Sequence, residues 1–265
     1  MTNAAFSAQQ LSAEFDETPF DRFTAATYNI HRCIGTDGRY SPSRVADVLE
    51  EVQADVVGLQ EVDTRLHVGR CRDQISYLAE RLDFYSVSGA RFAAGCGGRC
   101  ANAVLSRWPI FAHRVINLTV PGREPRTAIE AQIRLPTSRA DTPAGSCLRV
   151  VVTHFGLRGR ERLWQLETLL TQLGNNALSG SPLLLMGDLN EWRRSGPITR
   201  GLCEALICGR SVASFPSRYP LLPLDRMCSR SLKLTAEPRR HVSRSARVAS
   251  DHLPVSATFS VITKP

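Results

Sequence analysis

Strand-length and helix-length segments alternate along this chain in two successive blocks, and this order restricts the folds open to it. In the first block, Phe23–Asn29 reads as a strand, Ser41 is placed to cap a helix, and Asp55–Leu59 is a short apolar run. In the second block, Leu148–Phe155 and Pro182–Leu189 are apolar runs of strand length. Two mixed blocks predict an α/β fold with two packed sheets and helices outside, rather than one parallel sheet.

Further elements follow from the same patterns. Asp73 is placed to cap a second helix. Leucines at helical spacing mark another helix through Leu163, Leu166, Leu170 and Leu173. Additional strands are predicted at Ala103–Ser106, Thr127–Leu135, Leu224–Met227 and Val255–Val261.

No interdomain linker separates the two blocks. Residues 23–265 are therefore expected to form one domain behind a polar, flexible lead-in at residues 1–22. Residues 211–249 are the least regular part, with four prolines and many arginines, and are predicted to form loops over one edge.

The net charge of +8 is carried almost wholly by arginine, since Lys233 and Lys264 are the only lysines. Residues 1–90 carry a net charge of −6, residues 91–190 carry +6 and residues 191–265 carry +8. A basic C-terminal half suits an anionic partner such as a phosphate compound, a nucleic acid or an anionic phospholipid surface. The arginine tract Arg239, Arg240, Arg244 and Arg247 would suit either macromolecular partner, but a solvated arginine-rich loop gives the same pattern, and both interpretations stay open.

The sequence indicates an intracellular protein. No apolar run approaches the roughly 20 residues of a transmembrane span, and the acidic N-terminus lacks the basic and apolar regions of a secretory signal. We therefore expect a cytoplasmic protein, in monomeric form, whose eight cysteines are reduced thiols. The cysteine spacings match no strong zinc pattern.

Polar side chains cluster where the apolar strands end, which is a common way to build a site on a rigid frame. Each such residue has an ordinary explanation as a turn or structural residue, but their recurrence at five strand tips favours a shared site. They are Asn29, Glu61, His154, Asp188 with Asn190, and Asp251 with His252.

Oxygen ligands without clustered His or Cys favour a hard cation, and Mg²⁺ characteristically takes only one or two protein carboxylates. Glu61 supplies one, with Asn29 and Asp251 as neighbours. A histidine beside an acid can act as a general base or carry charge to a phosphate. The chain has no G-x-S-x-G, P-loop or G-x-G-x-x-G motif, so acyl transfer, nucleotide triphosphate motors and hydride transfer lose support.

Read in order, seven short motifs resemble those of the endonuclease/exonuclease/phosphatase superfamily: TYNIH, LQEVD, NAVLSRWPI, THFGL, GDLNEW, PLDRM and SDHLPV. The resemblance covers about residues 23–261, and the order and spacing of the motifs are more specific than any one of them. It implies a four-layered α/β sandwich with two packed mixed β-sheets flanked by helices.

The resemblance also implies roles for individual residues. Asn29 and Glu61 resemble the family's metal-site pair, with Glu61 the principal Mg²⁺ ligand and Asp251 a further carboxylate on the metal side. His252 resembles the catalytic histidine, and Asp225 the acid that orients it. His154 matches a second histidine that contacts phosphate or protonates a leaving group, Asp188 the residue that orients or deprotonates water, and Asn190 and Asn102 phosphate-binding amides. The role of Arg126 stays open.

These roles predict a phosphodiesterase that uses Mg²⁺, or Mn²⁺ in its place, for in-line attack of water on phosphorus. A phospholipid-type or small phosphodiester substrate is slightly favoured, because the motifs are most similar to small bacterial members grouped with sphingomyelinases and deoxyribonucleases. A nuclease acting on DNA or RNA is the alternative, although the lysine usual in abasic-site endonucleases is absent after Glu61. A catalytically silent binding scaffold is the alternative of another class, and it predicts damage to the site that the sequence does not show.

Overall fold

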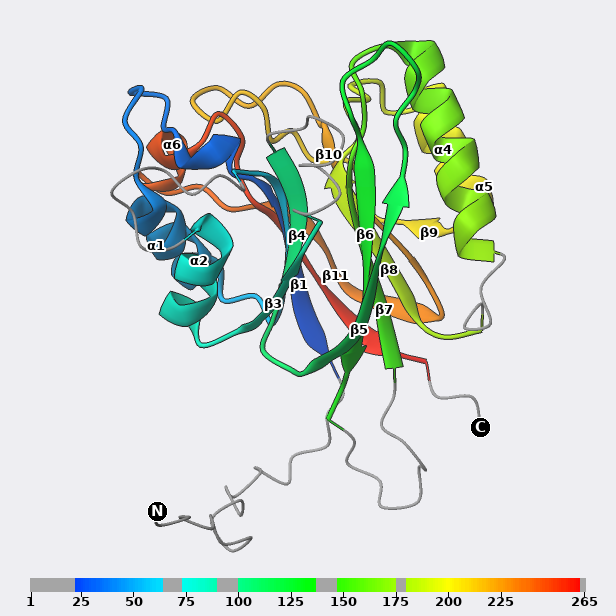
Figure 1. Ribbon diagram of the computed structural model, residues 1–265, viewed down its shortest axis with the longest axis horizontal. Helices are drawn as coiled ribbons and strands as arrows, with labels where there is room; N and C mark the ends of the chain where they lie inside the picture. The colour runs from blue at the N-terminus through cyan, green and yellow to red at the C-terminus, as the bar shows by residue number, and fades with distance from the viewer. Residues whose placement is uncertain (1–21, 64–72, 90–99, 137–146, 175–179, 263–265) are drawn as a thin grey trace, which may run out of the picture.

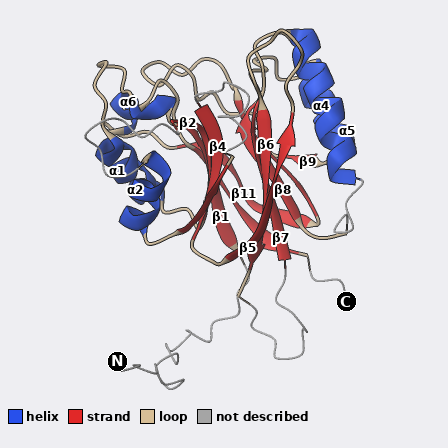
Figure 2. Ribbon diagram, in the orientation of Figure 1, coloured by secondary structure: helices blue, strands red, loops and turns tan. Residues whose placement is uncertain are grey.

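The computed structural model describes residues 22–63, 73–89, 100–136, 147–174 and 180–262. They form two six-stranded mixed sheets packed face to face, with helices on both outer sides (Figures 1 and 2). The four-layered α/β sandwich is confirmed. The lead-in predicted at residues 1–22 lies, apart from Arg22, outside the described residues.

The first sheet has the strand order β11-β12-β1-β2-β4-β3. Its strands are β11 (Leu232–Arg240), β12 (Val255–Val261), β1 (Phe23–Asn29), β2 (Val56–Asp63), β4 (Cys100–Ser106) and β3 (Tyr85–Ser88). Only β1 and β2 are parallel, since α1 (Pro42–Val52) crosses between them. Its outer face is covered by α1, α2 (Gln74–Leu82) and α6 (Ala246–Ala249).

The second sheet has the order β5-β6-β7-β8-β10-β9 and repeats the arrangement. Its strands are β5 (Ile110–Asn117), β6 (Thr127–Arg134), β7 (Cys147–His154), β8 (Leu183–Asp188), β10 (Asp225–Arg230) and β9 (Ile207–Cys208). Here β7 and β8 are the parallel pair, connected through α4 (Gly159–Gly174). Together with α5 (Pro197–Ala205), α4 covers the outer face of this sheet.

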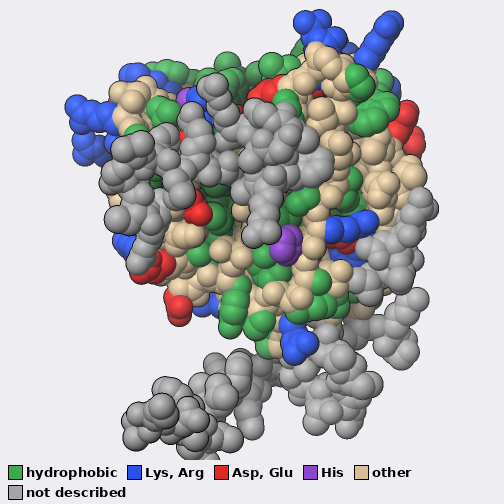
Figure 3. All heavy atoms as spheres, in the orientation of Figure 1, with side chains coloured by type: hydrophobic (Ala, Val, Ile, Leu, Met, Phe, Trp, Pro, Cys, Tyr) green, Lys and Arg blue, Asp and Glu red, His purple; other side chains and the backbone are tan. Residues whose placement is uncertain are grey.

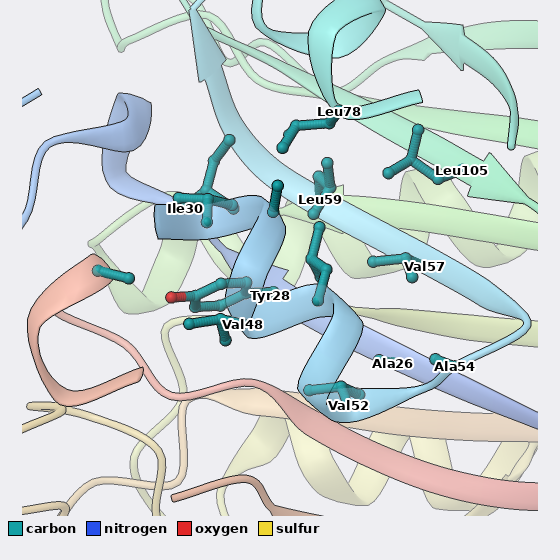
Figure 4. Packing of buried hydrophobic residues seen from close by; sticks show 14 of the residues in the cluster. Ala26, Tyr28, Ile30, Val48, Val52, Ala54, Val57, Leu59, Leu78 and Leu105 are labelled. Carbon is teal, nitrogen blue, oxygen red and sulfur yellow. The ribbon is translucent and has the colours of Figure 1, made fainter. Parts of the chain in front are cut away.

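Three apolar layers hold the sandwich together: one between the sheets, and one beneath the helices of each side. Figure 4 shows the layer under α1, where Tyr28 of β1 and Leu59 of β2 pack against Val48 of the helix. The two predicted helix starts are confirmed, because Ser41 accepts a hydrogen bond from Arg44 N and Asp73 accepts one from Ser76 N.

Some elements differ from the predictions. The leucine helix exists, but Leu163 is 38% exposed, and the buried face of α4 runs through Leu166, Leu169 and Leu173 instead. Residues 211–249 were expected to be mostly loops, yet β11 occupies Leu232–Arg240. This edge strand pairs with β12 through two register irregularities, which break the alternation by which a strand is read from sequence.

The cysteine prediction is wrong at one pair. Cys208 of β9 and Cys228 of β10 are directly paired across the two strands and form a disulfide. Cys100, Cys147 and Cys203 are free thiols. Among the described residues, no helix is long and apolar enough to cross a membrane.

Candidate active site

The predicted residues meet because of strand direction. The parallel strands β1 and β2 end on the same edge, and so do β7 and β8. The antiparallel neighbours β10 and β12 begin at this edge. In register, His154 at the end of β7 lies beside Asp188 at the end of β8, which lies beside Asp225 at the start of β10. In Figure 1 this edge is the upper one.

A cavity of about 670 Å³ opens at this edge and receives side chains from both sheets. Its lining includes six of the predicted site residues: Asn29, Glu61, His154, Asp188, Asn190 and His252. A smaller neighbouring recess is lined by Asn102 together with Glu61, Arg126 and His154. Asp225 lies behind His252, and Asp251 is not among the residues that line either space.

The buried carboxylate of Asp188 lies at the centre of the cluster. Its Oδ2 accepts a hydrogen bond from Asn29 Nδ2 at 3.2 Å. The Nε2 atoms of His154 and His252 lie 3.5 and 3.6 Å from the same oxygen. Its Oδ1 accepts from the backbone N–H of Asn190. One carboxylate therefore links residues of both sheets.

His252 is held by a chain of buried polar groups. Its Nδ1 lies 2.9 Å from Asp225 Oδ2, and Ser214 Oγ donates to that same carboxylate oxygen. Burial alone would lower the pKa of His252, but the negative charges of Asp225 and Asp188 and the hydrogen bond to Asp225 outweigh it and raise the pKa to about 10. At neutral pH the ring is therefore an imidazolium.

His154 differs from His252 in that its ring is neutral at neutral pH. Burial lowers its pKa most; Asp188 acts against this, while the positive charges of Arg126 and His252 reinforce it, and the pKa falls to about 3. Asn190 Nδ2 lies 3.1 Å from His154 Nε2, and Arg126 Nη1 lies 3.5 Å from His154 Nδ1. The pair of histidines thus offers one neutral ring and one charged ring to the same cavity.

Glu61 owes its position to a β-bulge. Leu59 pairs with Ala103 and Val62 with Ala101, so Gln60 and Glu61 together face the single residue Asn102. Glu61 has a φ of 57°, which turns its side chain out of the strand alternation and into the cavity, where its Oε1 lies 3.2 Å from Asn29 Nδ2. Opposite the bulge, the buried Asn102 donates to Thr127 O at 2.7 Å.

Local backbone geometry also sets the GDLN segment. Gly187 has a φ of 152°, and a Cβ at this position would lie 1.9 Å from Thr153 O. Only glycine allows this approach of β8 to β7. Asn190 has a φ of 51°, and its Nδ2 also donates to Phe155 O at 2.8 Å, which fixes the amide beside His154.

The donor set suits a hard cation bound through few protein ligands. Glu61 presents a partly exposed carboxylate to the cavity, and Asp188 supplies a second one. Both groups are oxygen donors of the kind that Mg²⁺ prefers. Within the described ranges, no cluster of three or more His, Cys, Asp or Glu side chains forms a cage for a metal. The Nδ2 of Asn29 donates to the carboxylates of Glu61 and Asp188, and its Oδ1 accepts from His31 N. The Oδ1 of Asp251 lies 3.9 Å from His31 Nδ1.

Sequence reasoning missed several residues around the cavity. Arg126, whose role was left open, contacts His154, and Ser214 bonds Asp225 from a segment without a recognisable motif. Ser250 Oγ donates to Asn29 O and accepts from His252 N. These two hydrogen bonds join the end of β1 to the segment that precedes β12. The serine directly before the Asp-His pair was visible in the sequence, but its partner Asn29 is 221 residues away.

Comparisons with known proteins agree with this fold. The model of the Endonuclease/Exonuclease/phosphatase family matches residues 26–252. The Escherichia coli K12 protein YbhP, described as uncharacterized, is 33% identical over 258 residues, covering 91% of this chain and 98% of YbhP.

Solved structures share the fold at lower identity. An endonuclease/exonuclease/phosphatase from Beutenbergia cavernae has a TM-score of 0.69 at 23% identity, over 91% of this chain and 72% of that one. A Bacteroides thetaiotaomicron mannosyl-6-phosphatase has a TM-score of 0.65 at 15% identity, over 89% of this chain and 99% of that one.

Proposed function

The chain belongs to the endonuclease/exonuclease/phosphatase family, whose members are phosphoester hydrolases, and on that premise we propose that it is a divalent-metal-dependent phosphodiesterase. One observation carries the proposal. Asp188 Oδ2 lies within 3.6 Å of polar atoms of Asn29, His154 and His252, in a cavity lined by residues of both sheets. A carboxylate with this surrounding can position a water molecule beside a bound phosphate.

The side chains of the site have two tasks: one activates the attacking water, and the others bind the phosphate. Asp188 orients the attacking water and accepts its proton as the new P–O bond forms. The imidazolium of His252, positioned by Asp225, neutralises charge on a nonbridging phosphoryl oxygen. His154, Asn190 and Asn102 hold the remaining phosphate oxygens, with neutral His154 better suited to contact than to proton donation.

Glu61 is the proposed principal ligand for Mg²⁺, or for Mn²⁺ in its place, with Asn29 beside it and Asp251 proposed as a further carboxylate on the metal side. A cation bound there would supply positive charge to the phosphoryl group and to the departing oxygen.

We propose a phospholipid-type or small phosphodiester as substrate. The cavity, at about 670 Å³, is much larger than a phosphate group, so it has room for an ester substituent. Leu157, Trp192 and Phe215 are also among the residues that line it, and they offer apolar contacts to such a substituent.

Hydrolysis of bis-p-nitrophenyl phosphate tests the activity directly. We expect turnover with Mg²⁺ or Mn²⁺ that is lost in EDTA and restored by added metal. Asp188→Asn should lower kcat by about 100-fold or more, because the water loses its acceptor. The matched control Asp47→Asn, on the exposed surface of α1, should retain wild-type kcat.

Absence of hydrolysis with either metal would favour a binding scaffold, and an Asp188→Asn protein with normal kcat would refute the site. A side-by-side panel of sphingomyelin, other phospholipids, plasmid DNA, abasic DNA and RNA then identifies the substrate class. Faster turnover of a nucleic acid than of every lipid would overturn the substrate proposal while leaving the phosphodiesterase intact.

A further inference from the structure

One side of the cavity mouth carries apolar side chains that are open to solvent. Leu157, Trp192 and Leu222 line the cavity yet are 73%, 53% and 36% exposed. Tyr219 and Leu221, in the same loop as Leu222, are 69% and 75% exposed. These five residues are here called the apolar rim. Exposed apolar groups gathered at one place usually mark an interaction surface.

The apolar rim belongs to three loops at the same edge of the sandwich. Leu157 lies in the loop between β7 and α4, Trp192 follows β8, and the other three precede β10. In Figure 1 these loops lie along the upper edge, where Figure 3 shows hydrophobic and basic side chains together with some acidic ones. The rim therefore surrounds part of the entrance to the site.

The same loops are positively charged. Their exposed arginines are Arg158, Arg160, Arg193, Arg194, Arg210 and Arg218. Within residues 155–160, 189–196 and 209–224, all of which are described, Glu191 is the sole acidic residue, and it is buried. Apolar and cationic side chains are thus interleaved in these three loops. The exposed carboxylate that lines the cavity, Glu124, lies outside them, between β5 and β6, where it pairs with Arg126.

We infer that the apolar rim and its arginines dock the protein onto an anionic phospholipid bilayer. Trp and Tyr are the residues that favour the membrane interface, and exposed leucines add apolar area that can enter the acyl layer. Arginines close to the surface are attracted by anionic headgroups. Single-stranded nucleic acid would also suit aromatic and cationic groups, but Leu157 and Leu221, the most exposed members, have no ring face on which a base could stack.

Docking in this orientation places the cavity mouth against the headgroup layer. A lipid phosphodiester could then reach Asp188 and His252 while its acyl chains stay in the bilayer. The inference rests on the proposed phosphodiesterase function of the cavity, and it specifies where the substrate is presented.

Vesicle co-sedimentation tests the docking without any need for activity. We expect the wild-type protein to bind vesicles of phosphatidylcholine with phosphatidylglycerol, to bind phosphatidylcholine vesicles weakly, and to be released by high salt. The double variant Leu157→Ser with Leu221→Ser should lower the partition coefficient about ten-fold or more, because the apolar contribution is lost. Both side chains project into solvent, so the fold should tolerate the change.

The matched control is Phe111→Ser with Ile207→Ser, which removes two apolar side chains, 49% and 59% exposed, from edge strands outside the three loops. It should bind vesicles like the wild type. Equal losses in both double variants, or no binding to anionic vesicles, would overturn the inference. Tight binding of a labelled single-stranded oligonucleotide that the Leu157→Ser, Leu221→Ser protein loses would assign the rim to nucleic acid and overturn it as well.

Hydrolysis of bis-p-nitrophenyl phosphate separates this inference from the proposed function. A protein that binds anionic vesicles but does not hydrolyse the soluble diester has a docking surface without the proposed activity. One that hydrolyses the diester but ignores vesicles is a phosphodiesterase whose rim does not dock to membranes.

Discussion

Asp225 shows how a residue outside the cavity can control a residue inside it. It touches His252 Nδ1 and Ser214 Oγ, and it is not among the residues that line the cavity. Its carboxylate both orients the ring and supplies the negative charge that favours the imidazolium. Asp225 is thus a positioning residue, and its contribution should appear in the chemical step.

We therefore expect Asp225→Asn to lower kcat for bis-p-nitrophenyl phosphate by about 100-fold or more, by analogy with other histidines that lose an orienting carboxylate. KM should change much less, because the residues that we propose to contact the phosphate remain. Steady-state kinetics at saturating metal give the two constants separately. If KM rose while kcat stayed normal, Asp225 would have a role in substrate binding instead.

For single residues, the sequence predicts which side chains belong to the site better than it predicts why a given residue is needed at its position. Asn29, Glu61, Asp188 and His252 could be singled out because each follows or precedes an apolar strand. Gly187 could not be assigned its role, since the need for glycine arises from the backbone of Thr153, 34 positions earlier and in the neighbouring strand. Nothing in one sequence shows such an approach.

Among the elements, β6 and α4 are joined by a buried charge cluster. Glu130 of β6 accepts hydrogen bonds at 2.6 Å from Arg149 Nε of β7 and from Arg114 Nε of β5. The two guanidinium groups also reach the last carbonyls of α4, at Leu173 and Gln172. One carboxylate thereby organises the cations that cap the C-terminus of the helix.

Glu130→Gln should destabilise the fold by about 3 kcal/mol, since Arg149 is fully buried and would lose its counter-charge. Most of this loss of stability comes from the ion pair with Arg149. The Arg114 side chain is 40% exposed, so its ion pair with Glu130 is screened by solvent. Urea unfolding measures the change. Glu50→Gln, which breaks the exposed pair with Arg81, should cost about 1 kcal/mol or less. Equal costs for the two variants would contradict a special role for the buried cluster.

The elements also show where pattern reading reaches its limit. Strands with continuous apolar runs, such as β7 and β8, are evident because both of their faces are buried. The edge strand β11 has only Leu232 and Pro238 buried, and its pairing is irregular, so no period of two is present to read. The bulge at Glu61 is hidden for a similar reason: it depends on β4, the strand opposite.

For the whole molecule, the important relation is the contact between the two sheets. Asn29 and Glu61 come from the first sheet, and His154, Asp188 and Asn190 from the second or the loop after it. The hydrogen bond from Asn29 to Asp188 crosses between them. The sequence predicted two packed sheets, but the strand order and the spacing between the sheets depend on long-range packing that local patterns do not encode.

Gly58 sets this spacing at the middle of β2. A Cβ there would lie 2.6 Å from Val152 Cγ2 and 3.0 Å from Met186 Cε, both in the opposing sheet. Gly58→Val would therefore overpack the layer between the sheets and lower the free energy of unfolding by about 1–3 kcal/mol. Because the proposed catalytic groups are divided between the sheets, kcat should also fall, at temperatures where the variant remains folded.

Urea unfolding and turnover of bis-p-nitrophenyl phosphate measure the two effects on the same protein. Gly180→Val is the matched control, since a Cβ at Gly180 meets no atom within 4 Å, and its stability should change by about 0.5 kcal/mol or less. A Gly58→Val protein that is destabilised yet fully active when folded would show that the site tolerates altered sheet spacing. A lower kcat in Gly58→Val, with normal kcat in Gly180→Val, would instead mean that the distance between the sheets is part of the active-site geometry.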